Sequence, residues 1–130
     1  MLFWSFMLAT SSLIPIAMMV VGAIFLKAAP KKINHVYGYR SQMSMKNRDT
    51  WEFAHQHCGR SYLRWGSAML VPSVIPMLFC VGDTALSGIL SAIICTVNLI
   101  PLIAVMVGTE KALKRTFDKN GNRIIGSTAL

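Results

Sequence analysis

The chain has 130 residues, of which 54% are hydrophobic and 14% are charged, and its formal net charge is +8. Soluble domains carry charge on about a quarter of their residues, so this composition indicates a membrane protein. It argues against a soluble enzyme, a nucleic-acid-binding domain and a secreted disulfide scaffold.

Three stretches of the chain contain no charged residue: 2–26, 65–82 and 84–109. A hydrocarbon core about 30 Å thick takes roughly 17 to 25 helical residues to cross, and each stretch reaches that length. The sequence therefore predicts an all-α membrane protein with three transmembrane helices at about these positions.

The first uncharged stretch could instead be a cleaved signal peptide. However, no basic residue precedes it, and it is longer than the apolar region of such a peptide, which has about 7 to 15 residues. Lys27, Lys31 and Lys32 follow it, as expected of a retained helix. We therefore expect a transmembrane helix here, kinked at Pro15.

Basic residues fall only in two regions, the loop 27–64 and the tail 110–130. The connection between the second and third stretches carries only Asp83, so these two helices form an antiparallel hairpin. Because Lys and Arg concentrate in cytoplasmic segments, we expect the loop and the C-terminus in the cytoplasm and the N-terminus outside. Asn98 is the only amide in the three stretches, and we expect it to bond a carbonyl freed by Pro101 or a partner helix rather than to serve transport.

The loop is predicted to contain an extended segment over 30–40 and an amphipathic helix over about 47–62. Ser44 and Asn47 are suited to capping this helix. Its apolar residues recur every three or four positions, which indicates an interfacial helix on the inner membrane surface that turns into the second span near Gly59. These residues are Trp51, Ala54, Cys58, Tyr62 and Trp65.

A spaced motif runs through this loop: Asn34-x-x-x-Gly38-Tyr39-Arg40-Ser41-x-x-Ser44-x-x-Asn47-x-x-x-Trp51-x-x-Ala54-x-x-x-x-Gly59. It resembles the signature of the SdpI family, small bacterial membrane proteins whose namesake confers immunity to a secreted peptide toxin. Ser41 stands where other members more often have Thr. The resemblance implies one SdpI-like domain over 1–130 in the bacterial inner membrane. It also implies a non-enzymatic protein that protects from, or senses, a membrane-active peptide through its basic, aromatic loop.

Seven loop residues are candidates for binding. Arg40 presents a planar, always charged fork that suits a phosphate or a carboxylate, so a lipid headgroup, an acidic partner, Asp49 or Glu52 could each pair with it. Short polar residues of the motif are equally suited to fixing turns and caps. The candidates are Asn34, Gly38, Tyr39, Arg40, Ser44, Asn47 and Trp51.

We expect no cofactor and no metal site. His35, His55, His57 and Cys58 are ligand types, but His55 and His57 point about 200° apart on a helix. Expected partners are the lipid bilayer and a peptide toxin or a cytoplasmic regulator, with no nucleic acid; a homo-oligomer is compatible with the sequence. Two other functions stay open: an oligomeric transporter or channel subunit, and a lipid-modifying enzyme acting through His55, His57 or Arg40.

The charge distribution predicts the result of reporter fusions. A reporter that fluoresces only in the cytoplasm should be bright after Leu130, and one that requires export should be active when inserted at Asp83, because positive charge retains a segment inside. The opposite pair of results would contradict both the orientation and the cytoplasmic placement of the loop.

Overall fold

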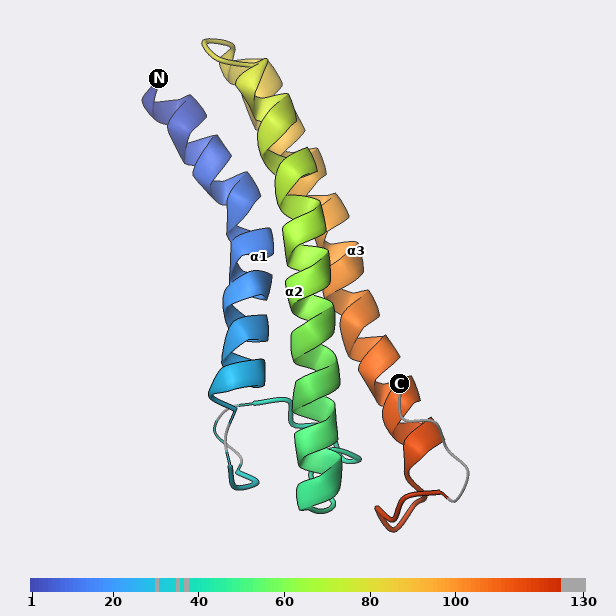
Figure 1. Cartoon of the computed structure of the whole chain (residues 1–130). Coiled ribbons are helices and arrows are strands. Elements are labelled where there is room, and N and C mark those ends of the chain that lie inside the picture. Colours follow the sequence, from blue (N-terminus) through green and yellow to red (C-terminus); the bar gives the residue numbers. More distant parts are fainter. Residues whose placement is uncertain (30, 35, 37, 125–130) are drawn as a thin grey trace.

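A computed structural model of the chain describes residues 1–29, 31–34, 36 and 38–124. The regular elements of this described part are three α-helices, α1 (Leu2–Lys27), α2 (Arg48–Leu78) and α3 (Thr84–Thr116), and one isolated β-bridge between Phe117 and Arg123. The helices run side by side along an elongated bundle, with the α2–α3 hairpin at one end and the loop and tail at the other (Figure 1). The all-helical prediction is confirmed.

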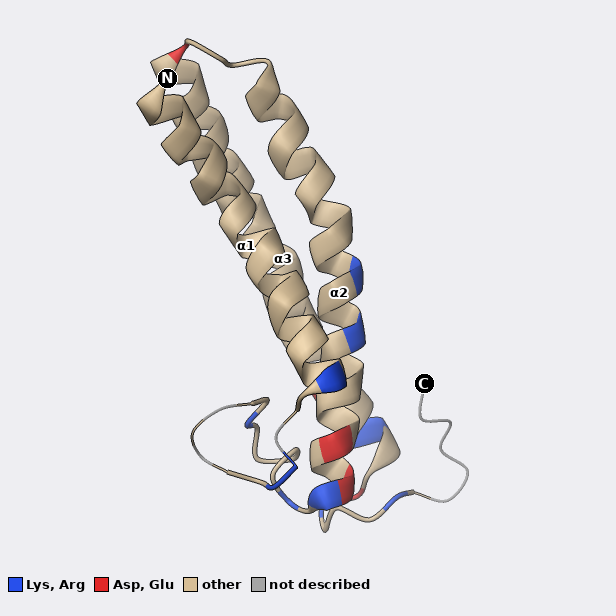
Figure 2. Ribbon diagram, turned by 60° about the vertical axis from the view of Figure 1, so that its left-hand side comes forward, with Lys and Arg blue, Asp and Glu red and all other residues tan. Residues whose placement is uncertain are grey.

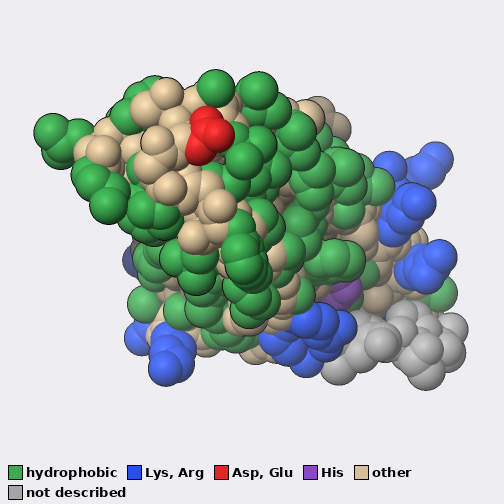
Figure 3. All heavy atoms as spheres, turned by 90° about the horizontal axis from the view of Figure 1, so that it is seen from above, with side chains coloured by type: hydrophobic (Ala, Val, Ile, Leu, Met, Phe, Trp, Pro, Cys, Tyr) green, Lys and Arg blue, Asp and Glu red, His purple; other side chains and the backbone are tan. Residues whose placement is uncertain are grey.

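Two of these helices, α1 and α3, are long and apolar enough to cross a membrane. In α2 the uncharged part covers only 65–78, because the helix ends at Leu78 and the predicted span continued to 82. Seen from the hairpin end, the surface is mostly hydrophobic (Figure 3). Exposed apolar side chains of this kind favour lipid contact over water. A third membrane crossing by α2 stays a prediction.

The prediction of a separate interfacial helix over 47–62 is wrong. Helix α2 continues without interruption from Arg48 through Gly59 to Leu78. Gly59 does not turn the chain, because it packs directly against Gly22 of α1: a Cβ added at Gly59 would lie 2.9 Å from the Gly22 carbonyl oxygen. Most of the apolar stripe that suggested membrane-surface contact is instead buried inside the bundle, whereas Trp65 at its end is 45% exposed. The buried residues are Trp51, Ala54, Cys58 and Tyr62.

A buried polar cluster joins the three helices halfway along the bundle. Pro15 has no N–H, so the carbonyl of Ser11 one turn earlier lacks its helical donor. The Asn98 side chain of α3 donates to that carbonyl over 3.3 Å and to the Ser73 hydroxyl of α2 over 3.1 Å. Asn98 thus has the structural role predicted for it, with the freed carbonyl supplied by Pro15 rather than by Pro101.

The charged residues separate along the bundle axis. Asp83 caps α3 at the hairpin by accepting from the Leu86 backbone N–H over 2.9 Å. The Lys and Arg residues lie toward the opposite end, which carries residues 27–64 and 110–124 and is called the basic end below (Figure 2). This separation is what the predicted topology requires, and the orientation in the membrane stays a prediction.

The contact between α1 and α2 generates a stability prediction. In Gly22→Ala the new Cβ would lie 2.7 Å from the Gly59 carbonyl oxygen and 2.9 Å from the Leu63 backbone nitrogen, so the helices must separate. Such overpacking costs about 1 to 3 kcal/mol, which exceeds the roughly 1 kcal/mol gained from replacing glycine in a helix. We expect a lower melting temperature in detergent.

Gly108→Ala in α3 is the matched control, because nothing lies within 4 Å of the Cβ that it would add. This variant should melt at the wild-type temperature or above it. Equal destabilisation by the two substitutions would show that the close approach of α1 and α2 is unimportant.

Candidate functional site

The motif residues Ser44 and Asn47 hold the loop against the start of α2. Asn47 caps the helix: its side-chain oxygen accepts from the Thr50 N–H over 2.8 Å, and the Thr50 hydroxyl accepts from the Asn47 N–H over 3.1 Å. The Ser44 hydroxyl donates to the Tyr39 carbonyl over 2.9 Å and is buried. Both side chains bond the protein's own backbone, which is the scaffolding role that the sequence allowed.

Gly38 lies directly over the His55 ring. Its φ is +113°, in a region that L side chains avoid, and a Cβ there would lie 2.6 Å from His55 Nε2. The next residue, Tyr39, donates its backbone N–H to the same Nε2 over 3.0 Å. Only glycine fits both the backbone conformation and the contact, so the motif glycine is the means by which the loop reaches α2.

His55 accepts the hydrogen bond from the loop as a neutral imidazole. Its Nδ1 lies 2.8 Å from the Trp51 carbonyl oxygen, which can only accept, so Nδ1 carries the proton and Nε2 is free to accept from Tyr39. Burial lowers the pKa of His55. The fully buried Trp51 ring packs beside the imidazole at a centroid distance of 4.5 Å. The motif tryptophan thus packs against the histidine that accepts the hydrogen bond from the loop.

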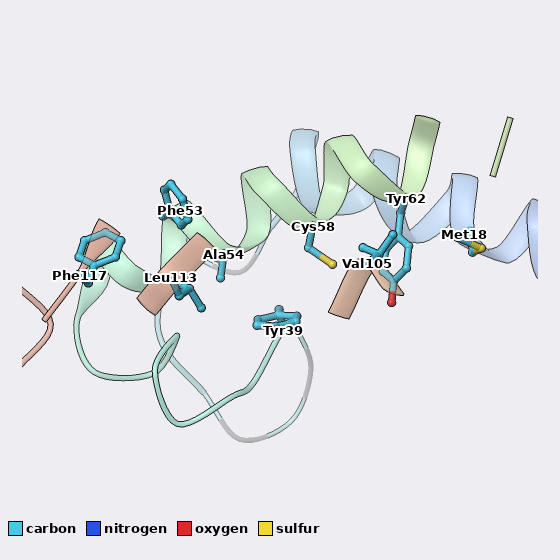
Figure 4. Packing of buried hydrophobic residues seen from close by; sticks show 9 residues of the cluster. All are labelled: Met18, Tyr39, Phe53, Ala54, Cys58, Tyr62, Val105, Leu113 and Phe117. Atoms are coloured by element: carbon cyan, nitrogen blue, oxygen red, sulfur yellow. The ribbon is translucent and has the colours of Figure 1, made fainter. Parts of the chain in front are cut away.

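Tyr39 connects the loop to α3. Its hydroxyl lies 3.0 Å from Glu110 Oε1 and 3.1 Å from the Met106 carbonyl oxygen. Burial and the hydrogen bond to Glu110 raise the pKa of Tyr39 well above its usual range, so it stays a neutral donor. Its ring belongs to the buried core cluster, which includes side chains from all three helices (Figure 4).

The tail packs against the start of α2. Arg123 makes two 2.9 Å hydrogen bonds to Asp49, and the Asn47 amide donates to the Gly121 carbonyl over 2.6 Å. Glu52 pairs with Arg48 at 2.9 Å. The two carboxylates considered as partners for Arg40 are thus engaged by other arginines.

A cavity of about 680 Å³ opens at the basic end, between α1, α3 and the loop. Three consecutive motif residues, Gly38, Tyr39 and Arg40, line it. The rest of the wall comes from Ser41 of the loop and from residues of the three helices. The helix residues are Val21, Phe25, Tyr62, Met106, Val107, Glu110, Lys111 and Lys114.

The structure therefore divides the seven candidate residues into groups. Gly38, Tyr39 and Arg40 meet at the cavity, whereas Asn34 forms a local turn in which its side chain accepts from the Val36 N–H over 3.0 Å. Trp51 contributes to a smaller cavity of about 310 Å³, and Ser44 and Asn47 hold the loop as described above.

Sequence reasoning missed the α3 side of the cavity. Glu110, Lys111 and Lys114 were counted only as part of the tail, although they share one helical surface directly after the uncharged stretch. Lys114 follows Lys111 by three residues and Glu110 by four, and this helical spacing was the available indication that the three side chains lie close together.

The histidine and cysteine side chains do not form a metal centre in the part of the chain that the structure describes, where no group of three or more potential ligands comes together. His55 uses both ring nitrogens in the contacts above, and His57 Nδ1 lies 3.3 Å from the Thr109 hydroxyl. His35 lies outside the described residues.

Long apolar helices, an internal polar cluster and a basic end with an ordered loop define a small helical membrane protein. The chain belongs to the SdpI/YfhL protein family, whose model matches residues 31–109, more than half of its length. This is a family of non-enzymatic, immunity-type proteins. The resemblance noted in the loop motif is confirmed. No curated protein and no solved structure matches the chain.

The contact between His55 and the loop predicts a pH dependence of stability. The folded state holds the pKa of His55 below 6.5, its value in an unfolded chain, so below that pH the unfolded state binds more protons. This contribution to stability is complete above pH 6.5 and is lost as the pH falls further, by at most about 1.4 kcal/mol per pH unit. The melting temperature in detergent should fall accordingly between pH 7.5 and 5.

His55→Gln keeps a side-chain acceptor for the Tyr39 N–H and removes the titration, so its melting temperature should depend less on pH. His57→Gln is the comparison variant: burial and the nearby Arg60 lower the pKa of that histidine too, so its removal should also reduce the pH dependence while the contact between His55 and the loop stays intact. If the melting temperature of His55→Gln depends on pH as strongly as that of the wild type, protonation of His55 does not cause the loss of stability at low pH.

Proposed function

We propose that this chain protects the bacterial cell that makes it from a membrane-active peptide, or senses such a peptide, through the loop 27–64. Membership of the SdpI/YfhL family supports an immunity-type role. The observation that carries the proposal is the placement of Gly38, Tyr39 and Arg40 at the mouth of the 680 Å³ cavity. The motif that characterises the loop thus forms an ordered surface rather than a connector.

The hydrogen bonds that hold this surface against the helices favour recognition. The loop bonds His55 of α2 through a backbone N–H and Glu110 of α3 through the Tyr39 hydroxyl, and Ser44 closes it on itself. A surface that is already ordered loses little conformational entropy when a partner binds. The partner in this proposal is the peptide itself or a cytoplasmic protein that reports its presence.

The proposed setting is the inner membrane, with the basic end in the cytoplasm and three crossings. The charge separation in Figure 2 supports this orientation, because Lys and Arg gather at the end opposite the hairpin. The role is non-enzymatic. His55, one of the two histidines considered for lipid chemistry, has both ring nitrogens engaged with backbone groups.

Arg40 provides the direct test of the proposal. If its planar guanidinium makes paired contacts with a partner, Arg40→Lys should lose protection almost as completely as Arg40→Ala, because an ammonium keeps the charge and loses the fork. Protection is measured as survival of the native host against membrane-active peptides, comparing deletion, wild-type expression and each variant. The melting temperature of each variant in detergent separates lost recognition from lost folding, because removing one partner of a buried intramolecular pair costs about 3 to 5 kcal/mol and lowers it.

Arg60→Lys and Arg60→Ala are matched controls, because Arg60 is an exposed arginine on α2 that does not line the cavity. Both should protect like the wild type. A fully protective Arg40→Ala protein would show that the loop is scaffold and that the site lies elsewhere.

A further inference from the structure

The 680 Å³ cavity lies across the boundary between the apolar and the charged parts of the bundle. On α1 its wall includes Val21 and Phe25, shortly before Lys27 ends the uncharged stretch. On α3 it includes Met106 and Val107 before that stretch ends, and Lys111 after it. The cavity therefore has an apolar part at the depth of acyl chains and a charged part at the depth of headgroups.

The charged part has an excess of cations. Arg40, Lys111 and Lys114 line it together with one carboxylate, Glu110, whose Oε1 accepts a hydrogen bond from the Tyr39 hydroxyl. A guanidinium can hold a phosphate through two parallel hydrogen bonds, and lysines add compact positive charges beside it. This set complements an anion better than a neutral or zwitterionic group.

The apolar part is open to the membrane side. Met106 is 49% exposed and Val107 48% exposed, so an apolar chain could leave the cavity between α1 and α3 into lipid. A volume of about 680 Å³ falls within the usual range for small-molecule sites, roughly 300 to 1,000 Å³. A soluble phosphate compound would leave this apolar wall without a partner.

We propose that the cavity is a binding site for one anionic phospholipid of the cytoplasmic leaflet. The phosphate lies among Arg40, Lys111 and Lys114, and an acyl chain follows Val21 and Met106 into the bilayer. This goes beyond the proposed function and rests on it only for the placement of the basic end at the cytoplasmic membrane surface. The bound lipid would hold the loop and the end of α3 together at the place where Tyr39 already joins them.

The test measures lipid retention by the purified full-length protein in detergent, using native mass spectrometry with phosphatidylglycerol and, as the zwitterionic comparison, phosphatidylcholine. We expect tighter binding of phosphatidylglycerol in the wild type. Lys111→Gln combined with Lys114→Gln should weaken it about tenfold or more, because losing a charge-assisted hydrogen bond to a phosphate costs roughly tenfold in affinity. Arg60→Gln combined with Arg64→Gln removes the same charge outside the cavity and should leave binding within about twofold.

A second pair of variants tests the apolar part without changing charge. Val107→Trp places a large ring in the cavity and should weaken phosphatidylglycerol binding several-fold, whereas Ile100→Trp, at another exposed position of α3, should not. Melting temperatures establish that each variant is folded. Binding is read on purified protein, so it can fail while cell protection persists, and the reverse.

Three results would overturn the proposal. The first is equal loss of binding in the cavity and control pairs, which would indicate general attraction of lipid to a basic surface. The second is displacement of the lipid by inorganic phosphate at equal concentration, which would indicate that the site binds phosphate itself and does not need the acyl chains. The third is preferential binding of an acidic amphipathic peptide that displaces phosphatidylglycerol, which would assign the cavity to a peptide.

Discussion

The close approach of α1 and α2 at Gly22 and Gly59 determines where the rest of the molecule lies. A side chain at either position would meet backbone atoms of the other helix, so the two helices can pack here only because both residues lack one. This contact keeps α2 on the bundle axis through Gly59. As a result the charged part of α2, residues 48–64, continues the bundle beyond the uncharged stretches and provides Trp51 and His55 as the surface on which the loop rests.

The consecutive motif residues Gly38, Tyr39 and Arg40 then have three separate physical tasks. Gly38 lets the backbone approach the imidazole, Tyr39 bonds α2 through its N–H and α3 through its hydroxyl, and Arg40 lies at the cavity that these contacts create. Removing the first two would displace the third. The motif therefore holds the Arg40 guanidinium at a defined position along the bundle axis.

Sequence reasoning predicted the helical class, the hairpin at Asp83 and the cap at Asn47, because each depends on composition or on neighbours in the chain. It did not predict the continuity of α2, since a stripe of apolar residues looks the same whether it faces a membrane surface or two other helices. Nor did it associate Tyr39 with Glu110, or Asp49 with Arg123, because contacts across more than 70 residues depend on how the helices pack.

The positive charge of the basic end would serve the two roles proposed above, membrane topology and anion binding, and these differ in how strongly they depend on the position of each charge. Topology depends on how many Lys and Arg residues flank the membrane segments, so a charge can move by several residues, and Lys can replace Arg, without consequence. A site for an anion depends on where each group lies and on its shape, which makes Arg40, Lys111 and Lys114 unequal to the other cations of the same end.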